Sequence, residues 1–159
     1  MIRKAFEADF DFIYGLYMHP NSNPYFLYEQ MNKSSFLPIF NELLAAEILF
    51  VYEKEKIAIG MCKLRPNLFR NAHIVYLGSV AIHPSFAGKG EGSKMMEEIK
   101  LYIMGKGFLR MELSVATENK KAIHLYEKAG FIKEGRLKKY TYLKTENRFM
   151  DEVLMAYLF

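Results

Sequence analysis

Just past the middle of the chain, residues 80–93 read Val80-Ala81-Ile82-His83-Pro84-Ser85-Phe86-Ala87-Gly88-Lys89-Gly90-Glu91-Gly92-Ser93. This stretch runs from an apolar strand through a loop with alternate glycines into a helix. Because glycine has no Cβ, several backbone N–H groups can face one concavity, and the helix adds its positive N-terminal end. The pattern predicts a site for a phosphate or pyrophosphate, with Lys89 adding a charge at the rim. A flexible glycine turn without a ligand is the alternative.

Two other phosphate-binding loops do not fit this stretch. A Walker A loop needs Gly-x-x-x-x-Gly-Lys-[Ser/Thr], which the sequence lacks. A dinucleotide-binding loop needs Gly-x-Gly-x-x-Gly, and Ser93 stands where the third glycine belongs. That loop also normally opens its domain. The sequence therefore favours a third kind of phosphate loop.

The loop resembles motif A of the GNAT acyltransferases, Arg/Gln-x-x-Gly-x-Gly/Ala. Gly90 and Gly92 match the motif, whereas Ala87 replaces the usual Arg or Gln. The resemblance implies an acetyl-CoA site in which the backbone of the loop holds the pyrophosphate and the preceding strand pairs with the pantetheine arm. The implied cofactor-binding residues are Val80, Ala81, Ile82, Gly88, Lys89, Gly90, Glu91, Gly92 and Ser93.

A second stretch, residues 115–131, resembles the family signature V-x-x-x-N-x-x-A-x-x-L-Y-x-x-x-G-F at every fixed position. Asn119 and Tyr126 are seven residues apart, so they share one face of the predicted helix. The resemblance implies that Asn119 contacts the cofactor arm and that the Tyr126 hydroxyl lies near the thioester sulfur. Tyr126 would then be the general acid that protonates the leaving thiolate. The alternative is a core aromatic on an amphipathic helix.

Hydrophobic periodicity gives the order of elements. Helical spacing covers residues 8–18, 35–46, 92–106 and 119–129, and β-type runs cover 2–5, 48–52, 57–64, 73–82, 109–115, 131–142 and 149–159. Gly78, inside a β-type run, suggests a bulge or a close backbone approach, and Gly130 suits the position after a helix. We predict an α/β chain with a mixed, mostly antiparallel central sheet flanked by about four helices, the GNAT acyl-CoA N-acyltransferase fold that the resemblance implies.

The composition limits the class of protein. The 159 residues fit one domain, residues 1–159, with a normal globular share of apolar and charged residues. The net charge of +4 suits an anionic ligand but is too scattered for a nucleic-acid binder. Cys62 is the only cysteine and four histidines lie apart, so we expect no disulfide and no metal site. Nothing reads as a signal peptide or membrane span, and we expect a cytoplasmic protein.

The resemblance implies an N-acetyltransferase that moves the acetyl group of acetyl-CoA to a primary amine by direct attack in a ternary complex. The amine would belong to a small metabolite, an amino acid or a peptide or protein N-terminus. In this family, residues 19–46 fall where acceptor selectivity sits. A non-catalytic acyl-CoA-binding module is the alternative, and a homodimer joined through the apolar final strand is a further expectation.

The sequence does not supply an obvious general base for the amine. Deprotonating an amine of pKa about 10.4 at pH 7 costs about 4.6 kcal/mol. Many relatives place a Glu in the strand before the glycine loop, but residues 73–80 contain no carboxylate. Tyr76 aligns near that position. We expect water to carry the proton out, past His73 or Tyr76, and a backbone N–H near Val80 to polarise the thioester oxygen.

Overall fold

The computed structural model describes all 159 residues. Its centre is one seven-stranded sheet of order β1-β2-β3-β4-β5-β7-β6. All neighbouring strands are antiparallel except β4 and β5, which are parallel. The strands are β1 (Ile2–Lys4), β2 (Leu49–Lys54), β3 (Ile57–Pro66), β4 (Ile74–Ile82), β5 (Arg110–Ala116), β6 (Ile132–Leu143) and β7 (Arg148–Leu158). The predicted mixed, mostly antiparallel sheet is confirmed.

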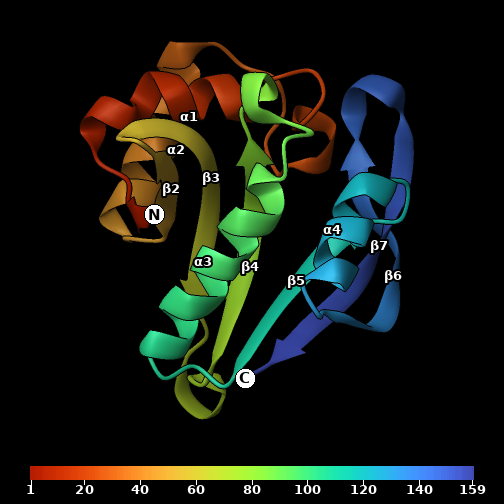
Figure 1. Cartoon of the computed structure of the whole chain (residues 1–159). Helices are drawn as coiled ribbons and strands as arrows, with labels where there is room; N and C mark the ends of the chain where they lie inside the picture. The colour runs from red at the N-terminus through yellow and green to blue at the C-terminus, as the bar shows by residue number, and fades with distance from the viewer.

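Four α-helices cover the two faces of the sheet (Figure 1). Helices α3 (Glu91–Gly105) and α4 (Lys120–Lys128) pack on one face, over a core of 20 buried residues. Helices α1 (Phe10–Tyr17) and α2 (Lys33–Ala45) pack on the opposite face, over a second core of 10 buried residues. The order of helices and strands agrees with the order predicted from periodicity.

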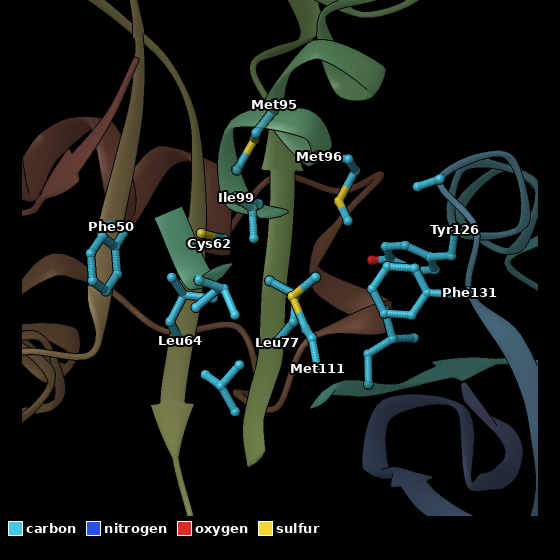
Figure 2. Packing of buried hydrophobic residues seen from close by; sticks show 14 of the residues in the cluster. Phe50, Cys62, Leu64, Leu77, Met95, Met96, Ile99, Met111, Tyr126 and Phe131 are labelled. Atoms are coloured by element: carbon cyan, nitrogen blue, oxygen red, sulfur yellow. The ribbon is translucent and has the colours of Figure 1, made fainter. Parts of the chain in front are cut away.

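The two helices beside the site form where local chemistry favours them. On α3 the predicted stripe of Met95, Met96, Ile99 and Ile103 is buried against the sheet, and Figure 2 shows part of this core. Helix α4 is capped by Asn119, whose side chain accepts a 3.3 Å hydrogen bond from the backbone N–H of Ala122. Gly130 follows the end of α4 with φ of +94°, a conformation that favours glycine.

Strands β4 and β5 pair over only three residues and then separate (Figure 1). The last pair is Tyr76 with Glu112. Beyond it, residues 77–82 of β4 have no strand partner on the β5 side. The predicted bulge at Gly78 is confirmed, because Met61 pairs with Ala81 but Lys63 pairs with Gly78. The extra residue lies on β4, where Ser79 has a positive φ of 50°.

Several expectations need correction. The first helix starts as a 3₁₀ turn, Glu7–Asp9, and α2 begins two residues earlier than predicted because Asn32 caps it. The final strand, β7, lies between β5 and β6, so it has no free edge for dimer pairing. The edge strands are β1 and β6. Periodicity locates strands but does not give their order in a sheet.

Candidate active site

A cavity of about 920 Å³ opens where the end of β4, the glycine loop, the start of α4 and the segment after α1 meet. Its lining combines backbone-rich, apolar and basic residues from these elements: Leu16, His19, Asn21, Ser22, Tyr25, Phe26, Val80, Ala81, Ile82, Pro84, Ala87, Gly88, Gly92, Glu118, Asn119, Lys120, Lys121, Ala122 and Leu125. Six of the predicted cofactor-binding residues therefore lie along one groove. Residues of the segment 19–46, where the resemblance implies acceptor selectivity, line the same groove.

The glycine loop leaves a continuous row of backbone donors free. The N–H groups of residues 88–93 make no hydrogen bond within the protein, and the first helical bond of α3 is Lys94 N–H to Gly90 C=O. Gly88 and Gly90 have φ of +73° and +80°, which turns successive amides in one direction. The leading amides of α3 also carry the positive end of its dipole. This arrangement suits an anion of the size of a pyrophosphate.

The charged side chains of the loop turn away from the groove. Lys89 Nζ donates to the backbone carbonyl of Ser85 at 2.8 Å. The buried Glu91 carboxylate accepts from Lys54 Nζ at 2.9 Å and Lys94 Nζ at 3.2 Å, and these bonds lower its pKa to about 2. Both residues are therefore available to a ligand through their backbone N–H groups, while Glu91 ties the start of α3 to β2.

Asn119 and Tyr126, the two residues of the second signature, lie at different depths in the structure. Asn119 lies in the groove, and its side-chain oxygen is occupied by capping. Tyr126 lies deeper, with its ring against Phe131 at a centroid distance of 5.8 Å, and its oxygen points from α4 toward β4 (Figure 2). Only 7% of Tyr126 is exposed, but its hydroxyl makes no hydrogen bond within the protein. No fully buried side-chain polar atom lacks a partner, so this hydroxyl reaches solvent.

Burial raises the pKa of Tyr126, and the nearby Tyr76 and Cys62 raise it further. The phenol therefore stays protonated at neutral pH and can donate a proton. Because the hydroxyl of this mostly buried ring has no partner in the protein and reaches solvent, it is free to bond to a ligand.

The two residues named for the proton path have different positions. The Tyr76 hydroxyl lies 2.8 Å from Ser114 Oγ and accepts from the Ser114 backbone N–H at 3.3 Å, where β4 and β5 part. It thereby takes the place of a strand partner for Ser114. His73 lies at the opposite end of β4, where its carbonyl accepts from Leu109, roughly 23 Å along the strand from Val80. His73 is too far away for the predicted relay.

The structure also brings in a pair that sequence reasoning missed. Tyr17, buried on α1, donates a 2.9 Å hydrogen bond to Ser79 Oγ in the bulge of β4. Gly78 signalled the bulge, but nothing local to Tyr17 indicates its partner, since 62 residues separate the two. This bond fixes the segment of β4 that borders the groove.

No group of three or more His, Cys, Asp or Glu side chains gathers in a way that could hold a metal ion. None of the helices combines the length and the apolar character needed to cross a membrane.

Comparison with known proteins gives consistent matches. A model described as Acetyltransferase (GNAT) family matches residues 10–131. Thialysine N-epsilon-acetyltransferases of Sus scrofa and Mus musculus are each 34% identical over 56 residues, which is 35% of this chain. The match spans 33% of each of these curated relatives, about a third of their length.

Solved structures match over nearly the whole chain. Spermidine N-acetyltransferase from Vibrio cholerae, in complex with CoA and spermine, superposes with a TM-score of 0.85 and 25% identity, covering 99% of this chain and 94% of that one. Ribosomal-protein-alanine N-acetyltransferase from Brucella melitensis gives a TM-score of 0.81 at 20% identity, covering 100% and 99%. The latter likeness shows the fold alone.

Proposed function

Because the chain belongs to the acetyltransferase (GNAT) family, we propose that it transfers the acetyl group of acetyl-CoA to a primary amine by direct attack in a ternary complex. The acceptor would be a small metabolite, an amino acid or a peptide or protein N-terminus. The observation that carries this proposal is the groove that begins at six unpartnered backbone N–H groups and runs along the unpaired part of β4.

The cofactor-binding residues follow from that groove. The backbone N–H groups of residues 88–93 would bind the pyrophosphate, and Val80, Ala81 and Ile82 would pair their free edge with the amides of the pantetheine arm. Asn119 would contact the arm through its side-chain amide nitrogen, because its oxygen caps α4. Bound in this way, acetyl-CoA supplies an activated thioester.

The reaction joins the amine nitrogen to the carbonyl carbon and breaks the carbon–sulfur bond. A backbone N–H near Val80, beside the bulge, would stabilise the negative oxygen of the intermediate. The Tyr126 phenol would donate its proton to the departing thiolate, and water would take the proton of the attacking amine. A Cys62 nucleophile has no part in this scheme, because Cys62 is buried and burial raises the pKa of its thiol.

The non-catalytic alternative is a module that binds acyl-CoA without turnover. The Tyr126 hydroxyl favours turnover over simple binding, because it is a proton donor that reaches solvent from a mostly buried ring beside the opened part of the sheet. A homodimer and a cytoplasmic location stay predictions, and strand pairing between copies would have to use β1 or β6.

An assay of CoA release over a panel of primary amines tests the function. We expect acetylated product in equal amount to released CoA with at least one amine. Acetyl-CoA should also raise the Tm with increasing concentration, since it binds only the folded state. A Tm shift without turnover on any amine would favour the binding module, and no shift at millimolar acetyl-CoA would refute both readings.

A further inference from the structure

Two unpaired cations lie together on the sheet face that α1 and α2 leave partly open. In the antiparallel pair of β3 and β4, Lys63 lies opposite Gly78 and Arg65 lies opposite Tyr76. Residues directly opposite each other share one face of a sheet. Leu64 and Leu77 between them point into the core under α3, so Lys63 and Arg65 point to the other face.

Lys63 is half-buried but has no anionic partner. It makes no hydrogen bond or ion pair within the protein, and its side chain lies over Gly78, where its Cε would be 3.4 Å from an added Cβ. Burial lowers the pKa of Lys63, and neighbouring Arg65 lowers it further. A lysine in such a place gains from a negative ligand, which would replace the hydration that burial removes.

Arg65 has no carboxylate partner either. Its guanidinium lies over the Tyr76 ring, 5.5 Å from the centroid. The four arginines at positions 3, 110, 136 and 148 all pair with carboxylates, and only Arg65 and Arg70 do not. Arg70 is exposed on the turn Phe69–Asn71, which joins β3 to β4 at the end of β4 opposite the bulge. Arg65 therefore combines free hydrogen-bond donors with a position opposite Tyr76, the residue at which β4 and β5 part.

The acids of this face have partners of their own. Glu112, opposite Tyr76 on β5, and Glu134 on β6 both bind Arg110, at 3.0 Å and 2.5 Å. Glu152 on β7 accepts a 2.8 Å hydrogen bond from Thr141. No carboxylate of the protein comes within ion-pair distance of either cation, so their charges are left for a ligand.

We propose that Lys63 and Arg65 bind a carboxylate of the acceptor, so that the substrate is a small amine that carries a carboxylate, such as an amino acid. This inference rests on the proposed function, which places the thioester beside the bulge of β4. Lys63 lies opposite Gly78, the residue before Ser79, so its stem is about 5–7 Å from the bulge by strand spacing. That span fits the few bonds between the amine and the carboxylate of a small amino acid.

The same geometry disfavours a polycationic acceptor. Two cations beside the attacking nitrogen would repel additional ammonium groups, and repulsion of like charges is a common source of specificity. The matched structure from Vibrio cholerae contains spermine, but its likeness to this chain does not transfer that ligand. We expect spermidine to be a poor acceptor here.

The test compares amines that differ only in the carboxylate. The assay with acetyl-CoA uses three pairs: glycine and glycinamide, β-alanine and β-alaninamide, and L-lysine and L-lysinamide. Spermidine is assayed beside them. The kcat/KM is expressed per unprotonated amine, because amidation lowers the pKa of the amine. We expect at least one carboxylate to be preferred over its amide by about 10- to 100-fold, the scale of a charge-assisted hydrogen bond.

Single substitutions then assign the preference. Lys63→Met and Arg65→Met should each collapse the carboxylate-to-amide ratio, whereas Arg70→Met, which removes an unpaired arginine elsewhere, should leave it unchanged. Lys63→Arg keeps the charge and should retain most of the ratio. The Tm of each variant shows that it is folded, and the Tm shift induced by acetyl-CoA shows that it binds acetyl-CoA.

The outcomes separate this inference from the proposed function. Equal rates for each amine pair, a preference for spermidine, or a ratio that both methionine variants keep would overturn the carboxylate site while leaving acetyl transfer intact. If no amine reacts, acetyl transfer fails, and the site is tested by the Tm shift that N-acetylglycine and N-acetylglycinamide give in the presence of CoA. A larger shift with the carboxylate, lost in Lys63→Met, would support the site, and equal shifts would refute it.

Discussion

The hydroxyl of Tyr17 on α1 donates a 2.9 Å hydrogen bond to Ser79 Oγ in the bulge of β4. Ser79 has a φ of 50°, which a residue with a Cβ adopts only when its surroundings hold it there. Tyr17 is fully buried among aromatic rings, with Phe36 at a centroid distance of 5.2 Å. The rigid aromatic core of α1 and α2 therefore sets the backbone of β4 that borders the groove.

Tyr17→Phe tests this relationship, because it keeps the ring and removes the donor. We expect the free energy of unfolding to fall by about 0.5–1.5 kcal/mol, the net worth of one hydrogen bond. The kcat should fall more than acetyl-CoA affinity, because the proposed function puts the reacting carbonyl beside the bulge. Urea unfolding and steady-state kinetics measure both effects, with the exposed and unbonded Tyr140→Phe as the control. If Tyr17→Phe and Tyr140→Phe had equal unfolding free energies and equal kcat, the hydrogen bond from Tyr17 to Ser79 would contribute neither to stability nor to catalysis.

Gly92→Ala tests the close approach of the cofactor to the loop. The φ of Gly92 is not positive, and an added Cβ would meet only Leu125, at 3.5 Å, which is an ordinary contact. The folded protein should therefore keep its Tm. In the presence of acetyl-CoA the Tm shift should shrink strongly, because the methyl group fills space beside the phosphate-binding amides. Gly105→Ala, at the other end of α3 and without neighbours, is the control.

Tyr126→Phe removes the proposed proton donor and keeps the packing against Phe131. Since the hydroxyl has no partner in the protein, stability should change little. We expect kcat to fall roughly 100-fold, the scale of one acid–base group, with acetyl-CoA affinity nearly unchanged. The measurement is steady-state kinetics beside the acetyl-CoA-induced Tm shift. A kcat equal to that of the wild type would make Tyr126 a core aromatic and no more.

The dependence of the rate on pH tests the absence of a general base. Strand β4 carries no carboxylate, and the hydroxyl of Tyr76 is held by Ser114. We therefore expect kcat/KM to rise with pH toward the pKa of the free amine. His73→Ala should leave that profile unchanged, because His73 lies at the far end of β4.

A plateau near pH 7 would contradict this expectation and require a base. The side chains of Glu29 and Glu42 are exposed to solvent. The Glu47 carboxylate forms an ion pair with Lys4 Nζ at 2.8 Å. Glu152 is a better first choice, since the strand register places it beside Ala116 on the β5 side of the opened sheet. Glu152→Gln would then abolish the plateau.

Glu91→Gln tests how the start of α3 is anchored. The bonds from Lys54 and Lys94 lower the pKa of Glu91 from 4.5 to about 2 in the folded state. A lowered pKa stabilises the fold above the unfolded value, and the contribution is lost as pH falls through the folded value. The Tm of Glu91→Gln should thus be lower than that of the wild type at pH 7, and the gap should close between pH 4.5 and about 2. Glu97→Gln is the control on the same helix, because its exposed carboxylate pairs only with Lys100 of α3 and does not tie the helix to β2.

Much of this architecture follows from local pattern. The stripe on α3, the turn at Gly130 and the bulge at Gly78 each depend on neighbours a few residues away, so their spacing in the sequence predicts them. The glycine loop is predictable for the same reason, because its free amides follow from positive φ angles and from the start of a helix. Individual ends shift by one or two residues where a cap such as Asn32 extends a helix.

The tertiary structure decided the contacts between segments that are distant in the sequence. Only the folded sheet inserts β7 between β5 and β6, separates β4 from β5 beyond Tyr76 and brings Tyr17 to Ser79. It also sets Lys63 and Arg65 side by side on the open face without a carboxylate. The sequence alone determined the elements and the glycine loop with its free amides, because these arise from short-range geometry. The acceptor side of the site depends on strand register and long-range packing, which no local spacing encodes.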